Sequence, residues 1–149
     1  MLNPEQCVAV ACIGDNLWVV LVPYHYLTGS GRWVVVPKGF QTDGASVPRA
    51  LWSAIPPTGL HFNAAVIHDC LYRSTDPNKP AKAECDRIFL EVMERDQVPP
   101  ERRLTMFEAV QLCGESSYVC GTGTAAPDRG EGRRNSLEMG TLTDTDKLT

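Results

Sequence analysis

Three absences limit what this chain can be. Its 149 residues contain no long apolar run, no excess of positive charge and no cysteine pairs at metal-binding spacing. The longest apolar stretch, residues 17–22, is far too short to cross a bilayer, so we expect no stable membrane insertion. Residues 1–6 hold no basic side chain and precede no long apolar segment, which predicts that the chain lacks a targeting signal and is soluble when made.

The shortage of positive charge argues against nucleic acid as a partner. The chain has 14 Lys and Arg residues against 18 Asp and Glu residues, a formal net charge of −4. Proteins that bind nucleic acid by neutralising phosphates need an excess of basic side chains. Arg133 and Arg134, near the C-terminal end, are too few to form such a patch.

The six cysteines form an even set, but their spacing is not that of a zinc finger. Without a secretory signal, buried free thiols are favoured over disulfides. A Cys70–Cys85 disulfide is kept as an alternative, because these two cysteines flank the region between residues 70 and 85 and could lie close together in space.

The ordered part of the chain is expected to be one α+β domain, residues 1–120, because its length suits a single core. Val-rich and aromatic segments separated by glycine turns predict a small antiparallel β-meander. Their hydrophobicity is continuous, which predicts that both sheet faces are covered. The predicted strands are residues 6–12, 17–26 and 32–37.

Three main helices are predicted after the strands, and a polar tail follows them. A loop shaped by glycine and proline spans residues 37–49, and a short helix is expected at 49–55. From residue 121 onward no hydrophobic period remains, so residues 121–149 are expected to be a flexible tail that orders only against a partner. The main helices are expected at residues 61–74, 80–96 and 100–119, the last with Leu104, Phe107 and Val110 facing inward.

Two of these helices place a histidine and a carboxylate on apolar faces. Helical spacing puts His68 on the same face as Tyr72, while Asp69 is turned away by about 100°. Asp86, on the next helix, shares its face with Phe89 and therefore points inward. Because a buried charge needs a partner, we expect Asp86, His68 and the Tyr72 hydroxyl to meet between the helices.

This cluster suits a histidine general base that activates water and is held in one tautomer by Asp86. Asp69 would then be available to hold a calcium ion with backbone carbonyls from a nearby loop. The alternative is a buried polar cluster that only ties two helices together, with His68 as a satisfied core residue.

A second candidate site is the loop that carries Asp43 and Ser46. Asp43 could be a further metal or substrate ligand. Ser46 could be a nucleophile with His68 and Asp86 as a triad, but it is not in a Gly-x-Ser-x-Gly elbow. The simpler hypothesis is that Asp43 and Ser46 cap backbone N–H groups before the next helix.

The segment His68-Asp69-x-x-Tyr72 resembles the His-Asp-x-x-Tyr helix of phospholipase A2-type enzymes, and its spacing is nearest to the compact viral-capsid version. The resemblance covers residues 56–90, although residues 56–60 depart from that family's calcium-loop pattern. It implies a hydrolase in which His68 is the base and Asp69 a calcium ligand, with Tyr72 and Asp86 orienting the histidine.

A broader resemblance covers residues 7–118 and links this chain to a family of small phage and prophage proteins known only as a domain of unknown function. It implies a phage setting and no established activity. The motifs that carry it are Phe40-x-Thr42-Asp43-Gly44-Ala45-Ser46-Val47-Pro48-Arg49, His68-Asp69-x-Leu71-Tyr72 and Asp86-x-x-Phe89.

Two functions of different classes follow from these patterns. The first is a virion-associated component of a tailed phage, made in the host cytoplasm, whose sheet and tail dock onto other phage structural subunits. The second is a small hydrolase that uses His68-activated water, with calcium as a possible cofactor, on lipid or another cell-envelope substrate during entry or lysis.

Overall fold

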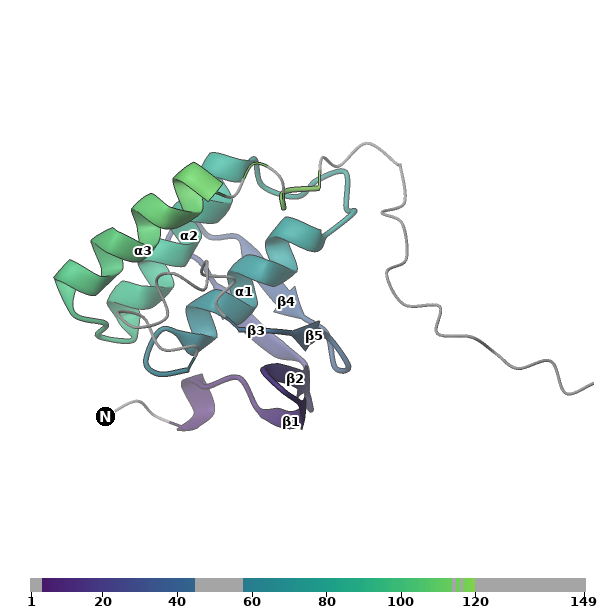
Figure 1. Ribbon diagram of the computed structural model, residues 1–149. Coiled ribbons are helices and arrows are strands. Elements are labelled where there is room, and N and C mark those ends of the chain that lie inside the picture. Colours follow the sequence, from purple (N-terminus) through teal and green to yellow (C-terminus); the bar gives the residue numbers. More distant parts are fainter. Residues whose placement is uncertain (1–3, 45–57, 114, 116, 120–149) are drawn as a thin grey trace, which may run out of the picture.

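The α+β architecture predicted from the sequence is present in the structure. The computed structural model describes residues 4–44, 58–113, 115 and 117–119, in which short strands precede three helices (Figure 1). The predicted helix at 49–55 and the tail at 121–149 lie outside the described residues. In chain order the elements are η1 (Pro4–Gln6), β1 (Val10–Gly14), β2 (Leu17–Val20), β3 (Tyr24–Leu27), β4 (Trp33–Val36), β5 (Gln41–Thr42), α1 (Phe62–Arg73), α2 (Lys82–Arg95) and α3 (Pro100–Cys113).

The predicted strand at 17–26 is in fact two strands, β2 and β3, separated by residues 21–23. Pro23 lies at this break, and proline has no N–H to donate to a ladder. The described strands therefore form a three-stranded antiparallel sheet in the order β1-β2-β5 and a separate β3–β4 hairpin, instead of a single meander. Strand β5 comes from the segment predicted to be a loop.

The β3–β4 hairpin has one buried face and one exposed face, so the prediction that both faces are covered is wrong for these strands. Tyr24 and Tyr26 are buried, and the residues between and after them are exposed. Val34 and Val36 face the core in the same alternation on β4. The helices cover only this inner side, on which α1 contacts β4 (Figure 1).

Helices α1 and α2 lie within two residues of their predicted limits and pack against each other. Most side chains of α1 are buried, because this helix lies between the strands and α2 (Figure 1). Helix α2 begins two residues after Pro80, and the chain leaves it through Gln97 at a positive φ of 58°. These two helices form the core that positions the candidate site.

Helix α3 packs on α2. It ends at Cys113, whereas the predicted helix extended to residue 119. The prediction that Leu104 faces inward is wrong, since this side chain is 57% exposed. Met106 occupies the buried position, while Phe107 and Val110 are half-buried. None of the helices in the described residues is long and apolar enough to cross a membrane.

The chain returns to α1 after α3, where the sequence had predicted more helix. The backbone N–H of Val119 donates to the carbonyl oxygen of Tyr72 at 3.0 Å. The Tyr118 ring packs edge-on against the Tyr72 ring at 5.4 Å, and its hydroxyl donates to the carbonyl of Pro80 at 2.8 Å. Residues 118 and 119 thereby cover the C-terminal end of α1.

Candidate functional site

The carboxylate of Asp86 is the centre of a hydrogen-bonded cluster between α1 and α2. Its Oδ1 atom lies 2.9 Å from Nε2 of His68 and accepts a hydrogen bond from the Tyr72 hydroxyl at 2.5 Å. Its Oδ2 atom accepts from the ammonium group of Lys82 at 3.0 Å. The contact predicted from helical spacing between His68, Tyr72 and Asp86 is therefore present.

Asp86 is 2% exposed, yet its environment favours the ionised form. Burial by itself raises the pKa of a carboxyl group, because it penalises the charge. Here the hydrogen bonds from His68, Tyr72 and Lys82 outweigh burial and hold the pKa of Asp86 below its usual range. Burial raises the pKa of Tyr72, and the hydrogen bond to Asp86 adds to this effect, so the phenol remains a donor.

These contacts engage one ring nitrogen of His68, Nε2, and none of them involves the other, Nδ1. An ionised carboxylate only accepts hydrogen bonds, so Nε2 of His68 carries a proton and Nδ1 of the neutral ring is a base. None of the described residues hydrogen-bonds to Nδ1. The ring packs against those of Tyr72 and Phe89, at centroid distances of 4.0 and 4.8 Å, and the residue is 9% exposed.

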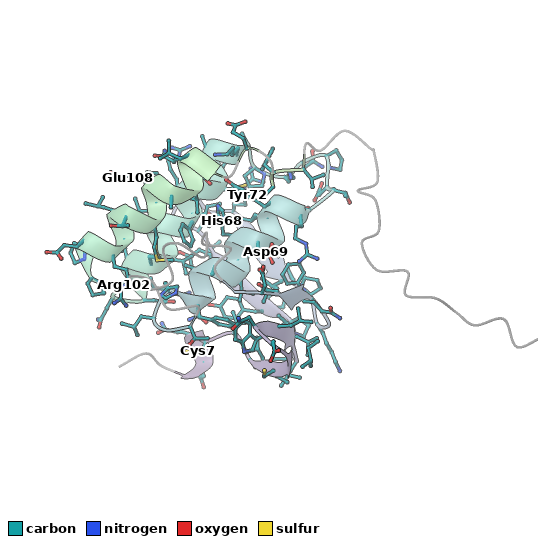
Figure 2. The ribbon with its side chains drawn as sticks, viewed as in Figure 1. Cys7, His68, Asp69, Tyr72, Arg102 and Glu108 are labelled. Atoms are coloured by element: carbon teal, nitrogen blue, oxygen red, sulfur yellow. The ribbon has the colours of Figure 1, made fainter. Side chains whose placement is uncertain are left out.

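Asp69 points away from this cluster and toward β5, as its position on the helix predicts (Figure 2). Its carboxylate pairs with Arg73 at 3.2 Å and contacts Thr42. Burial raises the pKa of Asp69, and the nearby negative charge of Asp43 adds to this effect, whereas Arg73 opposes it. Asp69 and Asp43, the two candidate metal ligands, are thus close enough to interact.

The predicted calcium site rests on two carboxylates, those of Asp69 and Asp43. No group of three or more His, Cys, Asp or Glu side chains within them could hold a metal ion. Asp69 is engaged by a guanidinium group, which a cation would have to displace. The assignment of Asp69 and Asp43 as calcium ligands stays a prediction, and Ser46 lies outside the described residues.

The cysteines near the site are free, so the alternative of a Cys70–Cys85 disulfide is wrong for this structure. The Cys70 thiol donates to the carbonyl of Val35, and the Cys85 thiol to that of Pro80. Burial raises the pKa of each thiol to about 11. Neither is therefore a nucleophile near neutral pH.

Sequence reasoning missed two parts of this region. Lys82 precedes Asp86 by four residues, a spacing that places both side chains on one helix face and could have identified it. Asp96, which follows α2, accepts hydrogen bonds from Asn63 at 2.9 Å and from Arg95 at 2.6 Å in a second buried cluster. No short spacing signals that cluster, because Asn63 is 33 residues away.

A family model described as a protein of unknown function, DUF1353, matches residues 18–110, more than half of the chain. The chain belongs to the DUF1353 family. It is also similar to the uncharacterized protein y4jT of Sinorhizobium fredii (strain NBRC 101917 / NGR234), with 35% identity over 85 residues, which is 56% of this chain and 24% of that protein. The chain therefore spans about a quarter of that relative's length. No solved structure matches it.

The part that matches the DUF1353 model contains the whole candidate site. His68, Tyr72 and Asp86 lie inside residues 18–110, as do Asp69 and Asp43. Tyr118, which packs on Tyr72, lies outside this range.

Proposed function

We propose that this chain is a hydrolase in which His68 activates a water molecule as a general base. The observation that carries the proposal is the double hydrogen bond at Oδ1 of Asp86, from His68 and Tyr72. It fixes the tautomer and the orientation of the imidazole ring, as a general base requires. Nδ1, which bonds to none of the described residues, is the atom that would accept the proton from water.

The chemistry that fits is hydrolysis of an ester. Nδ1 of His68 takes a proton from water, the hydroxide adds to the carbonyl carbon, and the carbon–oxygen bond to the alkoxide breaks as the proton passes to that leaving oxygen. Asp86 stabilises the imidazolium ion that forms between these steps. The resemblance to the phospholipase A2-type helix supports a lipid ester or another envelope ester as substrate, and no step is assigned to calcium.

The test is hydrolysis of phospholipid vesicles and of a soluble ester by the full chain, each with and without added calcium. Replacement of His68 by Ala should lower the rate by about 10²–10⁴-fold. His25→Ala is the matched control, because His25 is exposed on β3, away from the site. Equal rates for wild type, His68→Ala and Asp86→Ala in both assays would refute the proposed hydrolase activity.

A second candidate function is a virion-associated component of a tailed phage, and a different observation favours it. The outer face of the β3–β4 hairpin carries Leu27, Trp33 and Val35, which are 49%, 63% and 48% exposed. A contiguous apolar patch of this kind is typical of a protein interface. The resemblance to phage proteins supports other structural subunits as the partners, through this face and the C-terminal tail.

Mass spectrometry of purified particles tests this second function. The chain should be present at a fixed copy number relative to the major subunits. Trp33→Ser should reduce its incorporation, whereas Leu112→Ser, a change at an 82% exposed residue on α3, should not. Absence of the chain from purified particles would exclude the virion role without affecting the proposed hydrolase.

A further inference from the structure

The hydrogen bond between Tyr72 and Asp86 joins the ends of two helices. Tyr72 lies in the last turn of α1, and Asp86 lies in the second turn of α2. The connector between these helices, residues 74–81, is irregular. Helix ends open more readily than helix centres, because fewer contacts hold them in place. The distance between the Tyr72 hydroxyl and the Asp86 carboxylate therefore depends on what keeps these two ends together.

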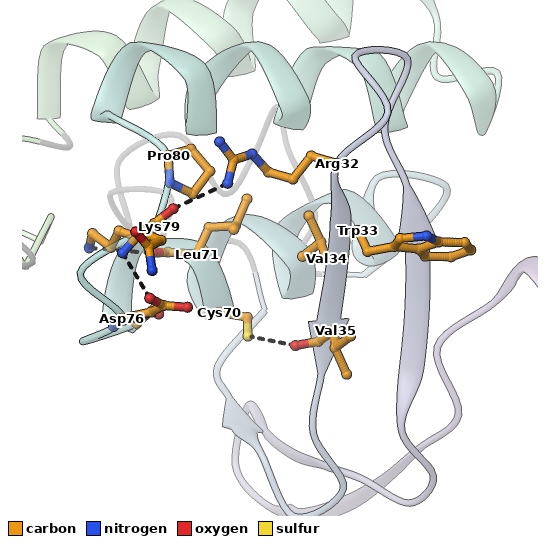
Figure 3. A pocket seen from close by; sticks show the side chains of 11 residues that line it. Arg32, Trp33, Val34, Val35, Cys70, Leu71, Asp76, Lys79 and Pro80 are labelled. Atoms are coloured by element: carbon orange, nitrogen blue, oxygen red, sulfur yellow. Dashed lines mark hydrogen bonds between the residues drawn. The ribbon is translucent and has the colours of Figure 1, made fainter.

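The last carbonyl groups of α1 are satisfied by groups from outside the helix. Carbonyls in the last turn of a helix have no partner within it, so other groups must supply the hydrogen bonds. The ammonium group of Lys79, in the connector, donates to the carbonyl oxygens of Tyr72 at 3.1 Å and Leu71 at 3.4 Å (Figure 3). The N–H of Val119 donates to the same Tyr72 carbonyl at 3.0 Å. The end of α1 is thus held by the connector and by the segment that follows α3.

The side chain of Tyr118 links the same connector to the ring of Tyr72. Its hydroxyl donates to the carbonyl oxygen of Pro80, two residues before α2 begins, at 2.8 Å. Its ring packs edge-on against that of Tyr72 at a centroid distance of 5.4 Å. The ammonium nitrogen of Lys79 lies 3.9 Å from the centroid of the Tyr118 ring, a cation–π contact. One side chain therefore contacts both sides of the junction between α1 and α2.

The packing on the Tyr72 ring fixes where its hydroxyl lies. The hydroxyl is at the far end of the ring, so a small rotation of the ring moves it away from Asp86. A hydrogen bond weakens steeply when its length or angle departs from the optimum, and this one is short, at 2.5 Å. The ring of His68 packs on Tyr72 from within α1 at 4.0 Å, and Tyr118 packs on it from a segment outside the two helices. Loss of the Tyr118 ring would leave space into which the ring of Tyr72 can turn.

We propose that Tyr118 is a positioning residue of the candidate site and acts through Tyr72, whose ring it holds so that the hydroxyl reaches Asp86. Tyr118 lies outside residues 18–110, so the site includes a segment beyond the part that matches the DUF1353 model. The effect of Tyr118 on the rate of hydrolysis rests on the proposed function. Its effect on the hydrogen bond between Tyr72 and Asp86 does not, and it can be measured separately.

Proton NMR of the full chain measures this hydrogen bond without any substrate. A hydroxyl proton in a short, strong bond to a carboxylate gives a resonance far downfield and exchanges slowly with water. In wild type this resonance should be present, and Tyr72→Phe assigns it by removing it. Tyr118→Ala should make its exchange about tenfold faster, the effect expected from losing one aromatic pair. Tyr118→Phe keeps the ring and should leave the exchange rate unchanged.

Val110→Ala is the matched control, because it removes side-chain packing at a half-buried position on α3. It should leave the hydroxyl proton at the wild-type exchange rate. The proposal is overturned if wild type shows no such resonance, or if Tyr118→Ala exchanges at the wild-type rate. It is also overturned if Val110→Ala accelerates the exchange as much as Tyr118→Ala does, because the effect would then be one of general stability.

Rates of ester hydrolysis test the route through Tyr72. Tyr118→Ala should lower the rate by less than about tenfold, as Tyr72→Phe should, and should lower it no further in the Tyr72→Phe protein. Two losses that multiply would show that Tyr118 does not act through the Tyr72 hydroxyl, and would overturn the proposal. If wild type hydrolyses no ester, the proposed function fails, and the NMR measurement alone decides whether Tyr118 positions Tyr72.

Discussion

Asp86 and Asp96 lie at opposite ends of α2, and each accepts a hydrogen bond from a side chain of α1. Asp96 is 0% exposed and binds Asn63 and Arg95. Asn63 also accepts from the N–H of Val8, so this cluster fastens the N-terminal segment to both helices. The carboxylate at each end is buried, but only one end includes a basic ring nitrogen without a hydrogen bond to the described residues.

The difference separates a structural network from the one that we propose to be catalytic. At the Asp96 end the hydrogen bonds join separate segments of the chain. Arg95, for example, also donates to the hydroxyl of Tyr24 on β3 at 2.9 Å. At the Asp86 end the bonds converge on one imidazole ring and orient it. The following predictions test whether stability and activity divide between the two ends in this way.

The largest expected effect on stability is at the Asp96 end. Asp96→Ala should lower the free energy of unfolding by about 3–5 kcal/mol, because it removes the buried carboxylate to which Arg95 and Asn63 both donate. Urea denaturation followed by circular dichroism measures this loss. The protein that remains folded should keep its rate of ester hydrolysis. A loss of that rate in the folded protein would contradict the assignment of Asp96 to stability alone.

The converse change is Asp86→Asn. It should lower the rate of hydrolysis by about 10²-fold or more, because the amide no longer stabilises the imidazolium ion. Its cost in stability should be smaller than that of Asp96→Ala, about 1–3 kcal/mol, because the asparagine side chain keeps the size of the aspartate and its amide can still hydrogen-bond to part of the cluster, which alanine cannot. The hydrolysis rates and urea denaturation curves of Asp86→Asn and Asp96→Ala, measured under the same conditions, show which carboxylate serves the reaction and which serves stability.

Acid should remove part of the stability contributed by Asp86. Its pKa in the folded protein lies below its usual value, so the ionised form favours folding above about pH 4. That stability is lost as the pH falls through the folded pKa. The difference in unfolding free energy between wild type and Asp86→Asn should therefore shrink as the pH is lowered from about 6 to about 3. A difference that stays constant over this pH range would show that the charge of the Asp86 carboxylate contributes nothing to stability.

Removal of the Tyr72 hydroxyl should have a smaller effect. Tyr72→Phe deletes one hydrogen bond to Asp86 and keeps the ring that packs on Tyr118. We expect a loss of about 0.5–1.5 kcal/mol in stability. The rate of hydrolysis should fall by less than about tenfold, because Asp86 still orients His68. A loss as large as that of Asp86→Asn would assign Tyr72 a direct part in the reaction.

The smallest effect is expected at Asp69. Burial raises its pKa in the folded protein, so its contribution to stability is present at low pH and lost as the pH rises through the folded pKa. Asp69→Asn should therefore slightly increase stability near pH 7, measured as a higher midpoint of thermal unfolding. If Asp69 binds calcium, the same variant should also abolish any calcium-dependent rise of that midpoint. A lower midpoint without calcium would show that the ion pair with Arg73 outweighs burial.

Much of the site at Asp86 was predictable because it depends on local periodicity. The spacing of His68 and Tyr72 places both on one helix face, and a charged residue on the apolar face of the next helix needs a partner. The cluster at Asp96 was not predictable in this way. It joins residues from four separate segments, and no spacing along the chain indicates which segments meet.

The sequence by itself determined the fold class, the limits of α1 and α2 to within two residues, and the meeting of His68 with Asp86. Only the tertiary structure decided that Pro23 separates two sheets, that Met106 instead of Leu104 faces the core, and that Tyr118 returns to Tyr72. The physical reason is the range of the interactions. Helical periodicity acts between residues three and four apart, whereas strand pairing and the choice of a buried face depend on what the rest of the chain places alongside.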